Sequence, residues 1–302
     1  MRALEAADRV LGKNHPKTLI IVNNLAAVYE GQSHYDKAGS LYERTLKTSE
    51  QVLGEDHLQT LQGVNNLAGL YRAQGRYSKA ELLYLRALNT RERILGKNHP
   101  DTLTSVNDLA LLLKEQGRYS EAKPLYLRAL KTNERVLGRD HPNTLASITN
   151  LAGLYYSQAR YGEAKPRYLH ALEASERIRG QDHLKTLISL NNLAALYQAQ
   201  GHSVEAEPLL VHALEAHERI LGEGHPSTLT IRLNLARVLI GRGQPDQALE
   251  ELRHVDKGPR GFVGIQLNTT LNEQYSIRNR IPCDWLLMCC CAGSAWLKSP
   301  RL

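Results

Sequence analysis

Residues 58–99 read LQTLQGVNNLAGLYRAQGRYSKAELLYLRALNTRERILGKNH, and residues 100–141 read PDTLTSVNDLALLLKEQGRYSEAKPLYLRALKTNERVLGRDH. The two stretches share one pattern without an insertion or a deletion. Six histidines mark this pattern along the chain, each 42 residues after the one before: His15, His57, His99, His141, His183 and His225. A period this strict predicts an array of stacked structural repeats in place of independent globular domains.

Each repeat contains two apolar stripes with the spacing of amphipathic helices. After His57 the first stripe consists of Leu61, Val64, Leu67, Ala68 and Tyr71, and the second of Tyr77, Ala80, Leu83, Tyr84, Ala87 and Leu88. Gly75 and Gly96 follow the stripes as helix stops, and Pro100 suits the first turn of the next helix. We therefore expect antiparallel helices near residues 58–73 and 77–94, which approach closely at their alanines.

These features predict an all-α fold, an α-solenoid in which helix pairs stack into a superhelical array. Because Ala3-Leu4 matches Ala87-Leu88, residues 1–15 are expected to form a partial repeat with only the second helix, as in a fragment of a longer protein. Residues 16–255 are expected to form six tandem repeats, the last of them incomplete. Residues 256–302 are expected to be a divergent, disordered tail.

The composition narrows the class of protein. The formal charge of +7 over 302 residues is smaller than a duplex-DNA binder usually concentrates on one face, so no nucleic-acid partner is expected. The N-terminal residues are charged and amphipathic and do not form a secretory signal, so we expect a cytoplasmic location. The apolar stretch 285–297 is about 13 residues long, whereas a helix that spans a membrane needs roughly 18 to 20.

The amino-acid composition changes abruptly where the repeats end and the tail begins. All 4 cysteines, both tryptophans and the only phenylalanine lie after residue 257, beyond the helix breakers Gly258 and Pro259. Three explanations are open. An alternative exon or a shifted reading frame would produce this change, the cysteines beside the apolar run could carry palmitate, or the segment could cap the last helix pair.

The order Leu67-Ala68, Tyr71, Gly75, Tyr77, Ala80, Tyr84, Ala87 resembles the tetratricopeptide (TPR) pattern over residues 1 to about 255. Glutamates stand where common TPR units place a proline, so the second helix is expected to run about two turns further. That longer unit, with an Asn-Asn-Leu-Ala first helix and a Leu-Gly-x-x-His-Pro connector, resembles the repeats of kinesin light chains and nephrocystin-type proteins.

The resemblance implies a non-catalytic protein-interaction scaffold that binds an extended peptide in a concave groove. The alternative is a kinesin-light-chain-like cargo adaptor of a microtubule motor. Kinesin light chains carry a heptad coiled coil for the motor heavy chain, and no heptad segment precedes the repeats in this sequence.

The resemblance also implies which residues face the groove: Asn23, Asn65, Asn107 and Asn191, two residues before the Leu-Ala pair. An asparagine amide offers both a donor and an acceptor, so a ladder of amides could hold a peptide backbone. The alternative is that these amides bridge neighbouring helices.

One turn deeper stand Arg72 and Lys114, which would favour a peptide with acidic residues. The alternative is that both side chains are solvated. A groove that binds RNA would need basic or aromatic inward positions, and the asparagines and small residues argue against it.

No cofactor, metal or catalytic site is expected, because none of the usual nucleotide-binding, zinc or nucleophile motifs occurs. A metal ligand must lie about 2 Å from the ion, whereas packed helices are about 8 to 10 Å apart, so the histidines of successive repeats cannot share one metal. We expect each of them to serve the free backbone groups at the start of a helix.

Overall fold

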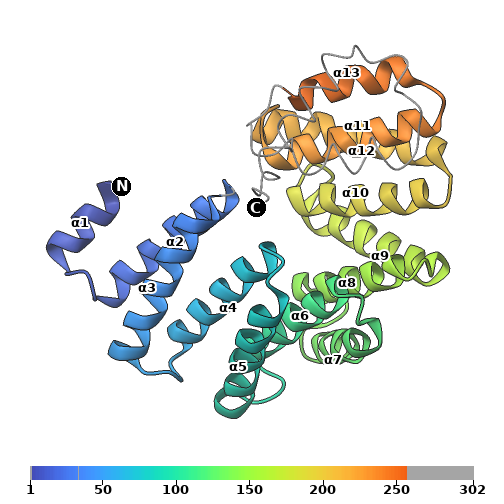
Figure 1. The fold of residues 1–302 in the computed structure, drawn as a ribbon. Coiled ribbons are helices and arrows are strands. Elements are labelled where there is room, and N and C mark those ends of the chain that lie inside the picture. Colours follow the sequence, from blue (N-terminus) through green and yellow to red (C-terminus); the bar gives the residue numbers. More distant parts are fainter. Residues whose placement is uncertain (1, 33, 257–302) are drawn as a thin grey trace, which may run out of the picture. The chain divides into compact units, whose positions relative to one another are not determined.

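The computed structural model describes residues 2–32 and 34–256, and every regular element in this part of the chain is an α-helix (Figure 1). The helices are α1 (Arg2–Val10), α2 (Pro16–Gly31), α3 (Tyr35–Leu53), α4 (Leu58–Ala73), α5 (Tyr77–Leu95), α6 (Pro100–Glu115), α7 (Tyr119–Leu137), α8 (Pro142–Ser157), α9 (Tyr161–Arg179), α10 (Leu184–Ala199), α11 (Ser203–Leu221), α12 (Pro226–Gly241) and α13 (Pro245–Asp256). We call the even-numbered helices helices A and the odd-numbered helices from α3 on helices B. The predicted all-α solenoid is confirmed, and α4 and α5 agree with the predicted limits to within one residue.

Each helix A begins at the repeated histidine. His15 Nδ1 accepts a hydrogen bond of 3.2 Å from the backbone N–H of Lys17, and the five later histidines make the same bond at 3.1 to 3.2 Å. This bond satisfies one of the backbone N–H groups that a helix start leaves free. The predicted capping role of the histidines is confirmed.

A glycine and a threonine connect each helix B to the next helix A. Gly54 ends α3 with a φ of +92°, a left-handed conformation that glycine adopts without a steric penalty. The buried hydroxyl of Thr60 in α4 donates to the Gly54 carbonyl at 2.8 Å. The same bond, at 2.7 to 2.9 Å, occurs in four later connectors, so one device sets the step from repeat to repeat.

The turns that follow α4, α6, α8, α10 and α12 also contain a left-handed residue. Gly75 and Gly117 have φ values of +71° and +74°, as expected for residues that end a helix A. After α8 the same position is held by Ala159, with a φ of +55°. It is the only residue other than glycine with a positive φ that the described part of the chain contains.

The core of the pair α4–α5 contains small residues and a tyrosine beside its leucines. In α4 and α5, Ala68, Ala80 and Ala87 are completely buried, and Tyr84 is 4% exposed. The small side chains let the two helices approach closely, and the tyrosine ring fills the remaining space. This packing agrees with the close approach at alanines that the sequence predicts.

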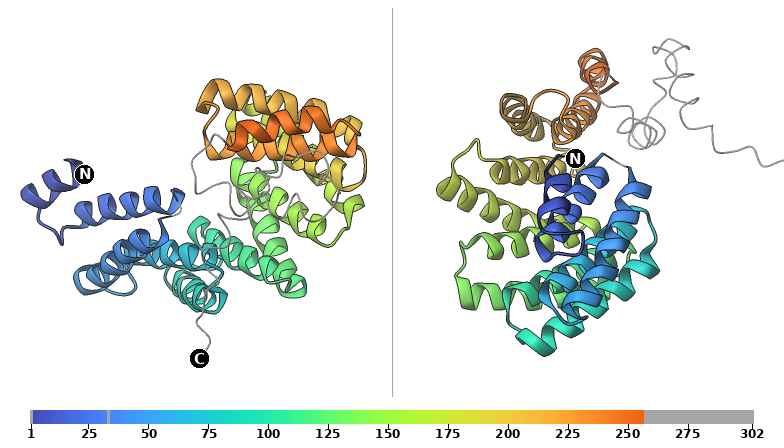
Figure 2. Two further views of the ribbon diagram at one scale, coloured as in Figure 1. Left: turned by 45° about the horizontal axis from the view of Figure 1, so that its top comes forward. Right: turned by 90° about the vertical axis from the view of Figure 1, so that its left-hand side faces the viewer.

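The chain divides into two compact units, residues 1–167 and residues 168–302. In the first unit the helices pack in sequence order from α1 to α8. In the second unit the helices also pack in sequence order, from α10 to α13. Figure 2 shows α11, α12 and α13 side by side, coloured gold to orange. Helices α2 and α4, α6 and α8, and α10 and α12 also contact each other, so within a unit consecutive helices A form one surface.

Residues 257–302 lie outside the described residues. The expectations of a disordered tail and of lipid on its cysteines concern this segment.

Candidate functional site

The four predicted asparagines occupy one position on four helices A. Asn23 on α2, Asn65 on α4 and Asn107 on α6 belong to the first unit, and Asn191 on α10 belongs to the second. Asn23 and Asn65 are 9% and 8% exposed, whereas Asn107 and Asn191 are half-buried. The position therefore lies at the border between the helix packing and the surface.

Two of these asparagines bridge to the helix A of the following repeat. Asn65 Nδ2 donates to Asp108 Oδ2 at 2.9 Å, which joins α4 to α6. In the second unit Asn234 Nδ2 donates to Asn191 Oδ1 at 2.8 Å, which joins α12 to α10. The partner is 43 residues away in both cases, so each bridge joins one helix A to the residue one position further along in the next helix A. At these two positions the bridging role occurs, and the role in a peptide ladder stays a prediction.

The bridge in the first unit includes a partly buried carboxyl group, that of Asp108. Burial raises the pKa of Asp108 to about 6, against the lowering effect of the positive charges of Arg91 and Arg72. Aspartate ordinarily titrates near pH 4. The group is thus divided between its neutral and charged forms near pH 6, and the charged form predominates at neutral pH.

Three of the asparagines keep an unpaired acceptor. The Oδ1 atoms of Asn23, Asn65 and Asn107 are buried and have no hydrogen-bond partner among the described residues. A buried acceptor without a partner costs about 1 to 3 kcal/mol. The recurrence of this cost on α2, α4 and α6 points to a use for the position beyond packing.

The two predicted basic residues lie close together in the first unit. Arg72 Nη1 is 2.5 Å from Glu115 Oε1, an ion pair that joins the end of α4 to the end of α6. Burial lowers the pKa of the Arg72 guanidinium, but Glu115 and Tyr84 together raise it by more, so the pKa lies above its ordinary value. Burial also lowers the pKa of Lys114, and Glu115 opposes this effect. Neither cation is simply solvated, since each is partly buried beside Glu115.

Tyr84 on helix B completes this cluster. Its hydroxyl accepts a hydrogen bond from Arg72, and burial followed by the charge of Asp108 raises its pKa to about 12. The hydroxyl therefore stays protonated and can donate as well as accept. The cluster offers donors and acceptors with nearly balanced charge.

The sequence prediction missed Asp108 and Glu115, the partners of two predicted residues. The sequence did contain a signal for Asp108, because the other five repeats have asparagine at the same repeat position: Asn24, Asn66, Asn150, Asn192 and Asn234. Glu115 had none, because an exposed glutamate at the end of a helix is common.

Two further properties concern the described residues. No three His, Cys, Asp or Glu side chains among them lie close enough together to hold a metal ion. Of the helices between residues 2 and 256, none combines the length and the apolar character needed to cross a membrane.

Solved structures with similar folds include repeat proteins from different sources. A Podosopora anserina putative kinesin light chain with nearly identical TPR-like repeats is 28% identical, with a TM-score of 0.53, and the match covers 65% of this chain and 93% of that one. BtubC (BKLC) from P. vanneervenii is 22% identical, with a TM-score of 0.59 and coverage of 80% and 93%. NprR in complex with its cognate peptide NprX is 17% identical, with a TM-score of 0.64 and coverage of 94% and 79%. The last two likenesses concern the fold alone.

A comparison with curated proteins finds no match. The family model described as tetratricopeptide repeat matches six overlapping segments: residues 1–48, 20–93, 64–134, 101–177, 145–216 and 186–255. These segments cover the described repeats from end to end. The chain therefore belongs to the tetratricopeptide repeat family, in the form that resembles kinesin light chain repeats.

Proposed function

We propose that the chain is a non-catalytic protein-interaction scaffold that binds an extended peptide segment of a partner protein. The binding surface is the one that helices A form within each unit, which corresponds to the concave groove of tetratricopeptide arrays. The observation that carries the proposal is the recurrence of Asn23, Asn65 and Asn107 with an unpaired amide oxygen on consecutive helices A. A peptide backbone has one N–H per residue, and it could pair with such oxygens after a rotation of the asparagine side chains.

The fold comparison supports this class of ligand. The structural match with NprR covers 94% of this chain, and NprR was solved with its cognate peptide bound. An extended backbone supplies the same hydrogen-bonding groups whatever its side chains are, so an amide ladder suits a peptide. We do not carry the preference for acidic residues into the proposal, because Glu115 already balances the charge of Arg72.

Panning a random peptide library on the full chain tests the proposal. We expect enriched peptides whose affinity falls about tenfold or more in the variant Asn65→Ala/Asn107→Ala, since each lost hydrogen bond is worth about 1 kcal/mol. The matched control is Asn89→Ala/Asn98→Ala, which removes two exposed amides that lie outside helices A. Equal losses in both variants, or no enriched peptide, would contradict the proposal.

The likeness to a putative kinesin light chain favours a second candidate, a cargo adaptor of a microtubule motor. This function needs a segment that binds the motor heavy chain. The complete transcript would have to encode a heptad coiled coil, and its product would have to co-purify with a kinesin heavy chain. A complete product that has neither property would exclude this candidate.

A further inference from the structure

A buried polar residue recurs on helix B and faces the next helix A. The five residues at this position are 2% to 4% exposed: Ser49, Arg91, Asn133, Ser175 and His217. In the first unit Arg91 Nη1 donates to Ser105 Oγ at 2.5 Å, and Asn133 Nδ2 donates to Ser147 Oγ at 3.0 Å. A serine on the following helix A thus accepts a hydrogen bond from each of these two buried side chains.

The pair formed by α11 and α12 in the second unit lacks the serine. His217 on α11 faces α12, where Ile231 occupies the position of Ser105 and Ser147. His217 Nδ1 lies 2.8 Å from the carbonyl oxygen of Ala213. Since a carbonyl can only accept, Nδ1 carries the proton and the neutral ring keeps an acceptor at Nε2. No hydrogen bond joins Nε2 to another residue in the part of the chain that the structure describes.

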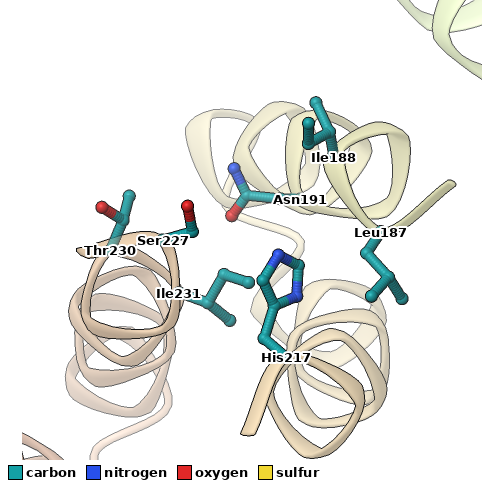
Figure 3. Close-up of a pocket in the computed structure, with 7 residues that line it drawn as sticks. All are labelled: Leu187, Ile188, Asn191, His217, Ser227, Thr230 and Ile231. Atoms are coloured by element: carbon teal, nitrogen blue, oxygen red, sulfur yellow. The ribbon is translucent and has the colours of Figure 1, made fainter. Parts of the chain in front are cut away.

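This nitrogen faces a cavity. Figure 3 shows the His217 ring directed into the space between α10 and α12, with one nitrogen toward Asn191. The cavity has a volume of about 170 Å³, and Leu187, Ile188 and Ile231 supply its apolar walls. His217 is 3% exposed, so the imidazole is almost fully covered and its free nitrogen is accessible only from this space. The unpaired acceptor and the cavity therefore form one site.

Asn191 gives the site a donor. Arg237 donates to Asn234 Oδ1 at 3.3 Å, which leaves Asn234 Nδ2 to donate to Asn191 Oδ1. The orientation of the Asn191 amide follows from this chain of bonds, and its Nδ2 is the group left for a ligand. No side chain with a formal charge lines the cavity apart from the titratable imidazole.

We propose that this cavity is a subsite of the peptide surface and receives one carboxamide side chain, asparagine or glutamine, of the bound segment. The ligand NH₂ group donates to His217 Nε2, its oxygen accepts from Asn191 Nδ2, and its methylene groups contact Leu187 and Ile231. A charged side chain would lose its hydration without gaining an opposite charge, and an aliphatic one would leave both polar groups unpaired. The inference rests on the proposed function insofar as the carboxamide belongs to a peptide.

Small probes test the subsite on the full chain without a known partner. The probes are N-acetylglutamine, N-acetylleucine and N-acetylglutamate, each as the N-methylamide, and each is titrated into the protein. Nuclear magnetic resonance follows the methyl groups of Ile188 and Ile231 and the ring nitrogens of His217. We expect the glutamine probe to shift these signals and to bind about three- to tenfold more tightly than the other two, the ratio that one hydrogen bond produces.

Two variants show whether the imidazole acceptor is responsible. His217→Phe keeps a ring but removes the acceptor, and Ile231→Ser gives His217 the serine partner that Arg91 and Asn133 have. Both are expected to lose the preference for the glutamine probe, while Val204→Ala, an exposed control on the same helix, keeps it. Circular dichroism confirms that each variant is folded.

The outcomes separate the subsite from the proposed function. If library peptides bind but the glutamine probe has no advantage, or if both variants keep that advantage, the subsite is wrong and peptide binding stands. If the probe behaves as expected but no library peptide binds, the carboxamide site exists and the peptide function is wrong.

Discussion

The helices A of the two units place charge of opposite sign against the neighbouring helices. In the first unit the carboxyl of Asp108 lies between α4 and α6, within the field of Arg72 and Arg91. In the second unit Arg232 is buried on α12, with its side chain 7% exposed, and pairs with Glu218 of α11 and Glu251 of α13.

The helix-A bridges differ in the same way. The bridge in the first unit has an ionisable partner, whereas the one in the second joins two neutral amides, Asn191 and Asn234. One repeat pattern thus tolerates either charge when the neighbouring helices supply partners. The stability of the two units should then respond differently to mutation and to pH.

The largest effect is expected at Arg232. Arg232→Ala removes the buried guanidinium and both of its ion pairs, and should lower the stability of α12 and α13 by about 3 kcal/mol. Hydrogen exchange of their backbone amides measures this locally, which suits a repeat array because its unfolding need not be all-or-none.

The control for Arg232 replaces the whole group by neutral residues. Arg232→Leu installs the residue that Leu190 provides one repeat earlier, and Glu218→Gln with Glu251→Gln removes the charges left behind. The triple variant should lie within about 1 kcal/mol of the unmodified chain. A loss as large as that of Arg232→Ala would show that the ion pairs are not the cause.

The next effect concerns pH in the first unit. Because the folded pKa of Asp108, about 6, lies above the unfolded value of 3.8, the folded state holds more protons between these values. The stability that the protonated group provides is complete below about pH 4 and is lost as the pH rises through 6.

Asp108→Asn keeps an acceptor for Asn65 and removes this titration. The variant should be more stable than the unmodified chain by up to about 3 kcal/mol at pH 7.5, and the difference should vanish near pH 4. Urea denaturation at both pH values measures it. A constant difference across the range would show that Asp108 does not titrate in this interval.

Removal of the bridging amides should give a smaller difference in stability between the two units. Asn65→Ala leaves a carboxyl oxygen of Asp108 without its donor and should cost about 2 kcal/mol, whereas Asn191→Ala leaves only the neutral amide of Asn234 and should cost about 1 kcal/mol. When Asp108→Asn is already present, Asn65→Ala should lower the stability by less than it does in the unmodified chain. Equal costs in both units, measured by hydrogen exchange, would contradict a role for the charge.

The smallest expected effect is in the turn after α8. Ala159→Gly installs the residue found at Gly75 and Gly117 and relieves a left-handed alanine. It should stabilise the first unit by about 0.5 to 1 kcal/mol, because the steric penalty exceeds the entropy that glycine loses on folding. The matched change Gly117→Ala should destabilise the unit by a similar amount, and thermal denaturation compares the two.

Much of the fold could be predicted because its signals are local. The helix limits follow from His57, Gly75 and Gly96, each of which acts within a few residues of its own position. The site could be predicted only in part. Asn65 and Arg72 were found from their place in the repeat, but their partners, Asp108 and Glu115, are 43 residues away and carry no local signal that links them.

The sequence by itself determined the repeat period, the helix pairs, the histidine caps and the family, since these depend on spacing and on backbone geometry within one repeat. Only the tertiary structure decided which polar groups are satisfied and which remain open. His217 looks equivalent to Arg91 and Asn133 by position, yet its Nε2 lacks a partner because Ile231 lies opposite. Whether a buried polar group is paired depends on the side chain that the next helix places against it, and that is a property of the packing.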